Sequence, residues 1–410
     1  MIAKLIKFAA LAAGAITLTP QLAHADWTRT YVIEWMEQAS YYGAKTGIID
    51  PGTDCPKGTN PEPNWVQMLV NAGYTREQAE WIRNPANPER SAVSGNPKMA
   101  FRGKNFASVY KDPESYPDPG VYEVEGKIGE GINLDGNAKT GFTSLTGEKG
   151  IDNEFYHALG CWKTFRGPPR LSSGAQTVND PMREGSWTML IVVHGEGKDP
   201  MNDNKVTVGL YQSGDPMVKS GDGKVVTDYT FTIQPNQKYE GVFTAKVKNG
   251  RITSTQPIDM MMRDPSPGAV RSGLEILRAQ VDFTMNKDGS LKGYIGGYRP
   301  WAPVYFGWSS FGQVNEVLTW IDLPASWYAM KRHADYSPAG KGGEKTHISF
   351  ALRVDALPAY VSTPDGSALV ASVRSYKQEA AATPAQTGGA MQAGAARQTA
   401  QAGSARPSGN

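Results

Sequence analysis

The chain has 410 residues, of which 42 are basic and 40 acidic, so its formal net charge is only +2. Its length and its 40% hydrophobic content are typical of one large globular domain or two small ones. So balanced a charge gives no reason to expect a nucleic acid or an anionic membrane as partner.

Residues 1–25 have the organisation of a secretory signal peptide. Two lysines precede an apolar run over residues 8–18, and Ala23-His24-Ala25 is a small-residue cleavage site before Asp26. The run is too short to span a bilayer, and no later segment has about 18 uninterrupted apolar residues. We therefore expect an exported protein, periplasmic or secreted, without a membrane span.

Residues 26–120 are predicted to form a helical segment. Thr28 would cap a first helix that Gly43 ends, and short helices follow at 64–71 and from Thr75, which has capping-box spacing to Gln78. The apolar residues that share one face of the first helix are Val32, Trp35, Met36 and Ala39.

Cys55 and Cys161 are the two cysteines of the chain. In an oxidising compartment the pair predicts one disulfide that closes a long loop, stabilising the fold by up to about 4–5 kcal/mol. Two unpaired thiols are the alternative. The sequence has no haem c, nucleotide or flavin signature.

The stretch "EGINLDGNAKTGFTSLTGEKGIDNEFYHALGCW", residues 130–162, is rich in oxygen ligands. Calcium is the cation that such hard-oxygen ligands favour. The predicted calcium ligands are Asn133, Asp135, Asp152 and Asn153. The alternative is a turn followed by a helix that Asp152 caps, with Glu154 in its first turn and Gly160 at its end. The two readings are compatible, because a capping side chain can still offer one free oxygen.

After Gly185 the pattern changes to short strands separated by turn residues. Asn249-Gly250 and Asp288-Gly289 predict hairpins, and short helices are expected near 314–320 and 325–333. The predicted strands are WTMLIVVH (187–194), KVTVGLYQ (205–212), YTFTIQ (229–234), VFTAKV (242–247), RITST (251–255), QVDFTM (280–285), LKGYIGGY (291–298) and HISFALRVDA (347–356). The fold class that we predict is mainly β, an antiparallel β-sandwich or jelly roll over residues 121–372. The tail, residues 373–410, is rich in Ala, Gly, Gln and Pro, and its composition predicts disorder.

Five segments occur in a fixed order between residues 121 and 360: GINLDG, GIDNEF, NDNKVTVGLYQSGDP, LKGYIGGYRP and HISFALRVDALPA. As an ordered set they resemble uncharacterised secreted bacterial β-sandwich proteins. The resemblance implies a secreted β-sandwich, and it implies no activity, cofactor or catalytic residue.

Aromatic residues are concentrated in "GYIGGYRPWAPVYFGW", residues 293–308. Rings beside an arginine can stack on a sugar or another planar apolar ligand. The predicted ligand-binding residues are Tyr298, Arg299, Trp301 and Trp308. The alternative is that these rings pack the core of the sandwich.

Signals for catalysis are weak, and the catalytic residues stay unknown. Four histidines follow the predicted signal peptide, and they form neither an H-x-H nor an H-E-x-x-H motif: His157, His194, His333 and His347. There is no G-x-S-x-G nucleophile motif. Glu123 and Glu125 are one carboxylate pair among many that could serve glycoside chemistry.

We therefore predict an exported ligand-binding or interaction protein, stabilised by calcium, with an aromatic-rich surface for a small-molecule or glycan ligand. The alternative is a periplasmic metal- or carboxylate-dependent enzyme.

Overall fold

The structure is a computed structural model. It describes residues 26–43, 52, 54–71, 73–84, 86–87, 102–234, 238–265, 273–310, 316 and 319–376. The predicted signal peptide, the tail beyond residue 376 and most of the predicted helix at 314–320 lie outside the described residues.

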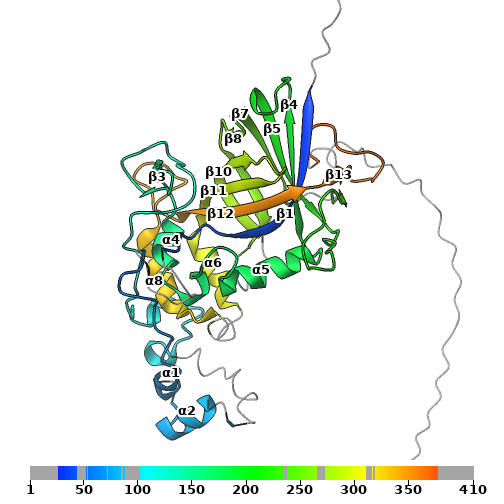
Figure 1. The fold of residues 1–410 in the computed structure, drawn as a ribbon. Coiled ribbons are helices and arrows are strands. Elements are labelled where there is room, and N and C mark those ends of the chain that lie inside the picture. The colour runs from blue at the N-terminus through cyan, green and yellow to red at the C-terminus, as the bar shows by residue number, and fades with distance from the viewer. Residues whose placement is uncertain are drawn as a thin grey trace, which may run out of the picture.

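The described chain is mainly β, as predicted, but its main sheet closes into an eight-stranded antiparallel barrel (Figure 1). The strand order is β11-β12-β1-β4-β5-β7-β8-β10, and β10 pairs again with β11. The barrel strands are β1 (Trp27–Gln38), β4 (Thr188–Gly195), β5 (Asn202–Ser213), β7 (Gly241–Lys248), β8 (Arg251–Ser254), β10 (Gly273–Met285), β11 (Leu291–Pro300) and β12 (His347–Pro358). The predicted open sandwich or jelly roll is therefore wrong.

An irregularity in β10 accounts for the closure. The pairing register of β10 with β11 shifts between Leu277 and Gln280, and Arg278 there has a φ of 51°. The first part of β10 pairs with β9 (Ile258–Arg263), while its later part pairs with β8. Because a bulge bends a strand and increases its twist, β10 can join β8 on one side and β11 on the other.

The predicted helix that begins at Thr28 is wrong, because these residues form β1. This strand pairs with β12 on one side and with β4 on the other, and α5 (Ser173–Arg183) packs against it. Val32, Ile33 and Met36 are buried. A shift in register between Ile33 and Trp35 interrupts the alternation of inward and outward residues. The resulting apolar spacing matches the periodicity of a helix.

Both predicted hairpins are confirmed. Asn249 and Gly250 have φ angles of 50° and 80° and connect β7 to β8, where Lys248 pairs with Arg251. Two consecutive positive φ angles are what a tight hairpin turn requires, and Asn-Gly adopts them readily. The turn that contains Asp288-Gly289 connects β10 to β11.

Helices cover one side of the barrel (Figure 1). α4 (Glu154–Leu159) packs on β12 and on α8 (Leu323–His333), and α8 also packs on α6 (Trp301–Ser309). The predicted helix at 325–333 is thus confirmed within α8. None of the helices in the described ranges is long and apolar enough to cross a membrane.

Two more helices, α1 (Trp65–Asn71) and α2 (Arg76–Arg83), stand apart from the barrel and share a small apolar cluster (Figure 1). The predicted capping box between Thr75 and Gln78 is confirmed at the start of α2. The remaining short elements are η3 (Lys104–Phe106), η4 (Pro113–Ser115), η5 (Lys163–Phe165), the antiparallel pair β2 (Phe142–Thr143) and β3 (Lys149–Ile151), and the parallel pair β6 (Thr230–Thr232) and β13 (Tyr360–Ser362).

The first residues of the predicted disordered tail lie against the barrel. Tyr376 is only 3% exposed, and its ring packs edge-on against Tyr211. Its backbone N–H donates to the Glu240 carboxylate over 2.9 Å. The described chain is therefore held to the barrel as far as residue 376.

Candidate metal centre

The helix α4 presents an acidic side chain and a histidine on one face. Asn153 caps it by accepting a hydrogen bond from the Tyr156 N–H, so the predicted cap at Asp152 is wrong by one residue. Glu154 and His157 are three residues apart, which places their side chains next to each other on the helix surface. Phe155 lies between them in the sequence and is buried in the core.

The helix α8 brings a second histidine to the same place. Asp322 caps this helix, and His333 is its last residue. Because α8 packs against α4, the rings of His333 and His157 lie with their centroids 4.2 Å apart.

The Glu154 carboxylate connects the two imidazoles. Its Oε2 lies 2.9 Å from Nδ1 of His157 and 2.7 Å from Nδ1 of His333. The exposed fractions of the side chains are 24% for Glu154, 36% for His157 and 13% for His333. The cluster is therefore partly shielded from water and still reachable by a small solute.

Glu123 holds the opposite side of the His333 ring. Its Oε2 lies 3.0 Å from Nε2 of His333, and its Oε1 accepts hydrogen bonds from the Arg332 guanidinium. Each ring nitrogen of His333 therefore faces a carboxylate.

The pKa values of His333, Glu123 and Glu154 are strongly shifted. Burial lowers the pKa of His333, but hydrogen bonds to Glu123 and Glu154 outweigh it and raise that pKa to about 9. Burial alone would raise the pKa of both glutamates. Hydrogen bonds to the histidines outweigh the effect of burial, and at Glu123 the hydrogen bonds from Arg332 add to them. The pKa of each glutamate therefore falls to about 2. The carboxyls of Asp152 and Asp335 lie close by. Burial raises the pKa of each to about 6.

Glu154, His157 and His333 fit the donor set of a transition-metal site. One ligand atom from each lies within 4.8 Å of the other two. Zinc bonds of about 2.0–2.1 Å in a tetrahedron separate neighbouring ligand atoms by about 3.3 Å. The observed separations of 2.7 and 2.9 Å need to widen by only about half an ångström, which small side-chain rotations provide.

Glu123 would then complete a familiar arrangement around His333. A histidine that binds a metal through one nitrogen usually donates its other N–H to a carboxylate, which fixes the orientation of the ring. With Nδ1 of His333 at the ion, Glu123 is the carboxylate that accepts from Nε2.

The four predicted calcium ligands make hydrogen bonds in turns and at the start of α4. Asp152 Oδ2 accepts from the backbone N–H groups of Leu134 and Asp135. Asn133 and Asp135 accept from backbone N–H groups two or three residues further on, and Asn153 caps α4. Calcium binding at these residues stays a prediction.

The four predicted ligand-binding residues are buried. Tyr298 stacks on Tyr336 with ring centroids 4.2 Å apart, and Arg299 donates to Asp264 in an ion pair at 2.7 Å. Trp301 and Trp308 are 6% and 1% exposed. Binding of a sugar or an apolar ligand by these residues stays a prediction.

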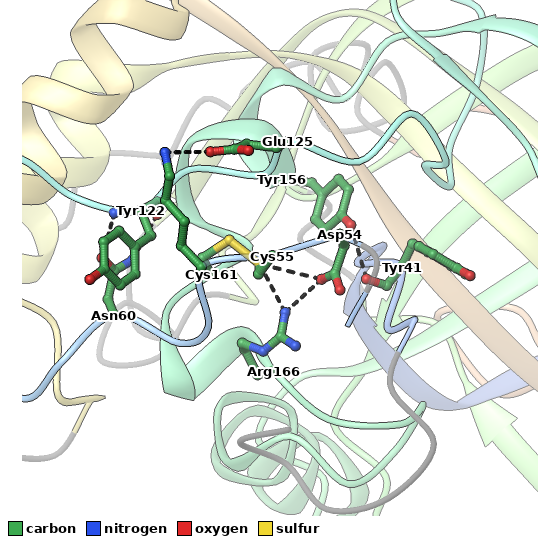
Figure 2. Close-up of a disulfide and its surroundings, with 10 residues drawn as sticks. Tyr41, Asp54, Cys55, Asn60, Tyr122, Glu125, Tyr156, Cys161 and Arg166 are labelled. Carbon is green, nitrogen blue, oxygen red and sulfur yellow. Dashed lines mark hydrogen bonds and ion pairs between the residues drawn. A yellow bond between two sulfur atoms is a disulfide. The ribbon is translucent and has the colours of Figure 1, made fainter. Parts of the chain in front are cut away.

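The predicted disulfide between Cys55 and Cys161 is confirmed, and it joins segments 106 residues apart (Figure 2). Both cysteines are buried, and Nη1 of Arg166 lies 2.9 Å from the Cys55 sulfur and 2.6 Å from the Asp54 carboxylate. Cys161 follows α4 almost directly, so the disulfide ties this helix to residues 54 and 55.

The sequence indicates the histidines and Glu123 as candidates, but it does not predict that His157, His333 and Glu123 lie at one site. The Glu154-x-x-His157 spacing was the available signal, since residues three apart on a helix share a face. The other two histidines have different partners: His194 on β4 bonds Thr28, and His347 at the start of β12 bonds Thr346.

Comparison with known proteins gives no match: no protein-family model, curated protein or solved structure matches this chain.

Proposed function

We propose that this is an exported protein that binds a divalent transition metal ion, zinc being the best fit, through Glu154, His157 and His333. The observation that carries the proposal is that Nδ1 of His333 and Nδ1 of His157 both lie within hydrogen-bond distance of Glu154 Oε2, at 2.7 and 2.9 Å. Export is supported by the disulfide, since disulfides persist in oxidising compartments.

The donor set favours zinc over calcium or magnesium. Calcium and magnesium take oxygen ligands, whereas imidazole suits zinc, copper, iron and nickel. Two histidines and one glutamate occur at catalytic zinc sites, which keep a fourth position for water or substrate. A metal-dependent enzyme is therefore the second candidate, and the 36% exposure of the His157 side chain favours it.

The test is metal content and affinity. After treatment with a chelator, the protein should bind one equivalent of zinc in a calorimetric titration. His157→Ala and His333→Ala should each weaken binding by roughly 100-fold or more, because removing a ligand costs more than the 10–100-fold loss typical of its supporting groups. His194→Ala is the control and should bind zinc as the wild type does, since His194 bonds Thr28 on β1.

Absence of zinc binding in the wild-type protein would contradict the proposal. The cluster would then be an ion-pair network in which a charged His333 balances Glu123 and Glu154. Equal binding by the wild type and both histidine variants would show that zinc binds elsewhere.

A further inference from the structure

We propose that Asn60 is a positioning residue of this metal centre: together with the disulfide it holds the segment that presents Glu123 to His333. The inference rests on the metal-binding function proposed above and adds to it the device that orients the His333 ring.

The segment that carries Glu123 depends on contacts from elsewhere for its position. Residues 117–126, all of them described, belong to neither a helix nor a strand. Its backbone groups bond to three other parts of the chain: the Asn60 side chain, the Asp54 carbonyl and the end of α4. Those bonds determine the position of the backbone from which the Glu123 carboxylate reaches His333.

Asn60 makes two hydrogen bonds to the backbone of Tyr122, the residue directly before Glu123. Its side-chain oxygen accepts from the Tyr122 N–H at 2.6 Å, and its side-chain nitrogen donates to the Tyr122 carbonyl at 2.8 Å (Figure 2). Asn60 is only 6% exposed, so water competes little for these two bonds.

The disulfide fixes Asn60 relative to α4. The Asn60 N–H donates to the carbonyl of Cys161 at 2.8 Å, and Cys161 is bonded to Cys55. Next to Cys55, the Asp54 carbonyl accepts from the N–H groups of Glu125 and Gly126. Residues 54–60 therefore hold the Glu123 segment on both sides of Glu123, and the disulfide ties them to the helix that carries Glu154 and His157.

The Glu123 segment is also bonded directly to one of the proposed metal ligands. The Val124 N–H donates to the carbonyl of His157 at 3.0 Å, so Glu123 lies between a residue held by Asn60 and a residue held by α4. From there its carboxylate accepts from Nε2 of His333, which directs Nδ1 toward Glu154. Loss of the Asn60 bonds would release the backbone on one side of Glu123, and the His333 ring would then be oriented less strictly, by Glu154 and by a Glu123 that Arg332 still holds.

The test compares two buried asparagines. Asn179 makes the same pair of bonds to the backbone N–H and carbonyl of Met36, on β1. Asn60→Ala should weaken zinc binding by roughly 10–100-fold, the usual effect of losing a group that supports a ligand. Asn179→Ala should keep zinc affinity within about twofold of the wild type. It loses those two bonds and a third, to the Ala175 carbonyl, so it should melt at a temperature at least as low as that of Asn60→Ala, which loses two. Zinc affinity is measured by competition with a chromophoric chelator, and the absorption spectrum of bound cobalt(II) reports the ligand geometry.

A double-mutant cycle ties the effect to Glu123. In the Glu123→Ala background, Asn60→Ala should cause no further loss of zinc affinity, because the group that it positions is gone. Wild-type affinity and an unchanged cobalt spectrum in Asn60→Ala would overturn the inference while the metal site stands. A full further loss in the Glu123→Ala background would overturn it too. A wild-type protein that binds no zinc would instead refute the proposed function on which the inference rests.

Discussion

Trp308 and Phe306 are two residues apart on α6 and have opposite environments. Trp308 is 1% exposed and contacts the rings of Phe155 and Phe165, whereas Phe306 is 44% exposed. Trp308→Ala should lower the free energy of unfolding by about 3–5 kcal/mol, since it leaves a large cavity in the core. Phe306→Ala is the matched control and should cost about 1 kcal/mol or less. Urea denaturation measures both, and similar losses for the two variants would contradict the assignment of Trp308 to the core.

Glu123 and Glu125 show how little two positions in a sequence reveal about a site. Glu125 forms an exposed ion pair with Lys57 at 2.6 Å, while Glu123 points to His333 and Arg332. The sequence suggests both as one carboxylate pair, but each carboxylate has a separate cationic partner from a distant part of the chain. Their roles could not be predicted without the position of α8.

The elements divide clearly into those that local pattern predicts and those that it does not. Strands with a turn signal beside them, such as β7 and β8 around Asn249-Gly250, are correctly predicted because the signal is local. Strand β1 is mispredicted because it lies between two other strands and contains an irregularity after Ile33. Burial by partners distant in sequence outweighs the local periodicity there.

The turn before α4 is the element at which calcium can be tested. Asp152→Ala removes the acceptor of two backbone N–H groups and should cost about 2 kcal/mol of stability with or without calcium. Asp152→Asn keeps an acceptor oxygen and removes the charge. If calcium binds, millimolar calcium should raise the melting temperature of the wild type and not that of Asp152→Asn. An equal melting temperature in calcium and in chelator for the wild type would rule out the calcium prediction.

At the scale of the whole molecule, closure of the barrel and assembly of the candidate centre both depend on long-range pairing. The same list of strands fits a sandwich or a barrel, and the ring closes only because β12, near the end of the described chain, pairs with β1 as well as with β11. The centre likewise joins Glu123 to His333, 210 residues further along the chain. Hydrophobic period and turn chemistry carry no information over such separations, so these features could not be predicted.

A buried ionic cluster gives the whole molecule a specific dependence of stability on pH. Arg102 pairs with Glu316 at 2.6 Å and with Asp322 at 3.2 Å. Burial raises the pKa of Asp322 from 3.8 to about 6, against the opposing effect of Arg102 and with a further rise from Glu316. Burial also raises the pKa of the tyrosines around the cluster, which stay protonated in this range: Tyr110, Tyr116 and Tyr305.

The raised pKa means that folded Asp322 holds its proton more tightly than the unfolded chain does. Its contribution to stability is therefore fully present below pH 3.8 and is lost as the pH rises through about 6. The difference between the two pKa values corresponds to about 3 kcal/mol. Asp322→Asn keeps an oxygen to cap α8 and cannot ionise. Between about pH 4 and pH 7 the variant should therefore gain about 3 kcal/mol of unfolding free energy relative to the wild type. Urea denaturation of both proteins at intervals of one pH unit measures the two free energies of unfolding. A difference between them that stays constant with pH would show that ionisation of Asp322 does not destabilise the folded protein.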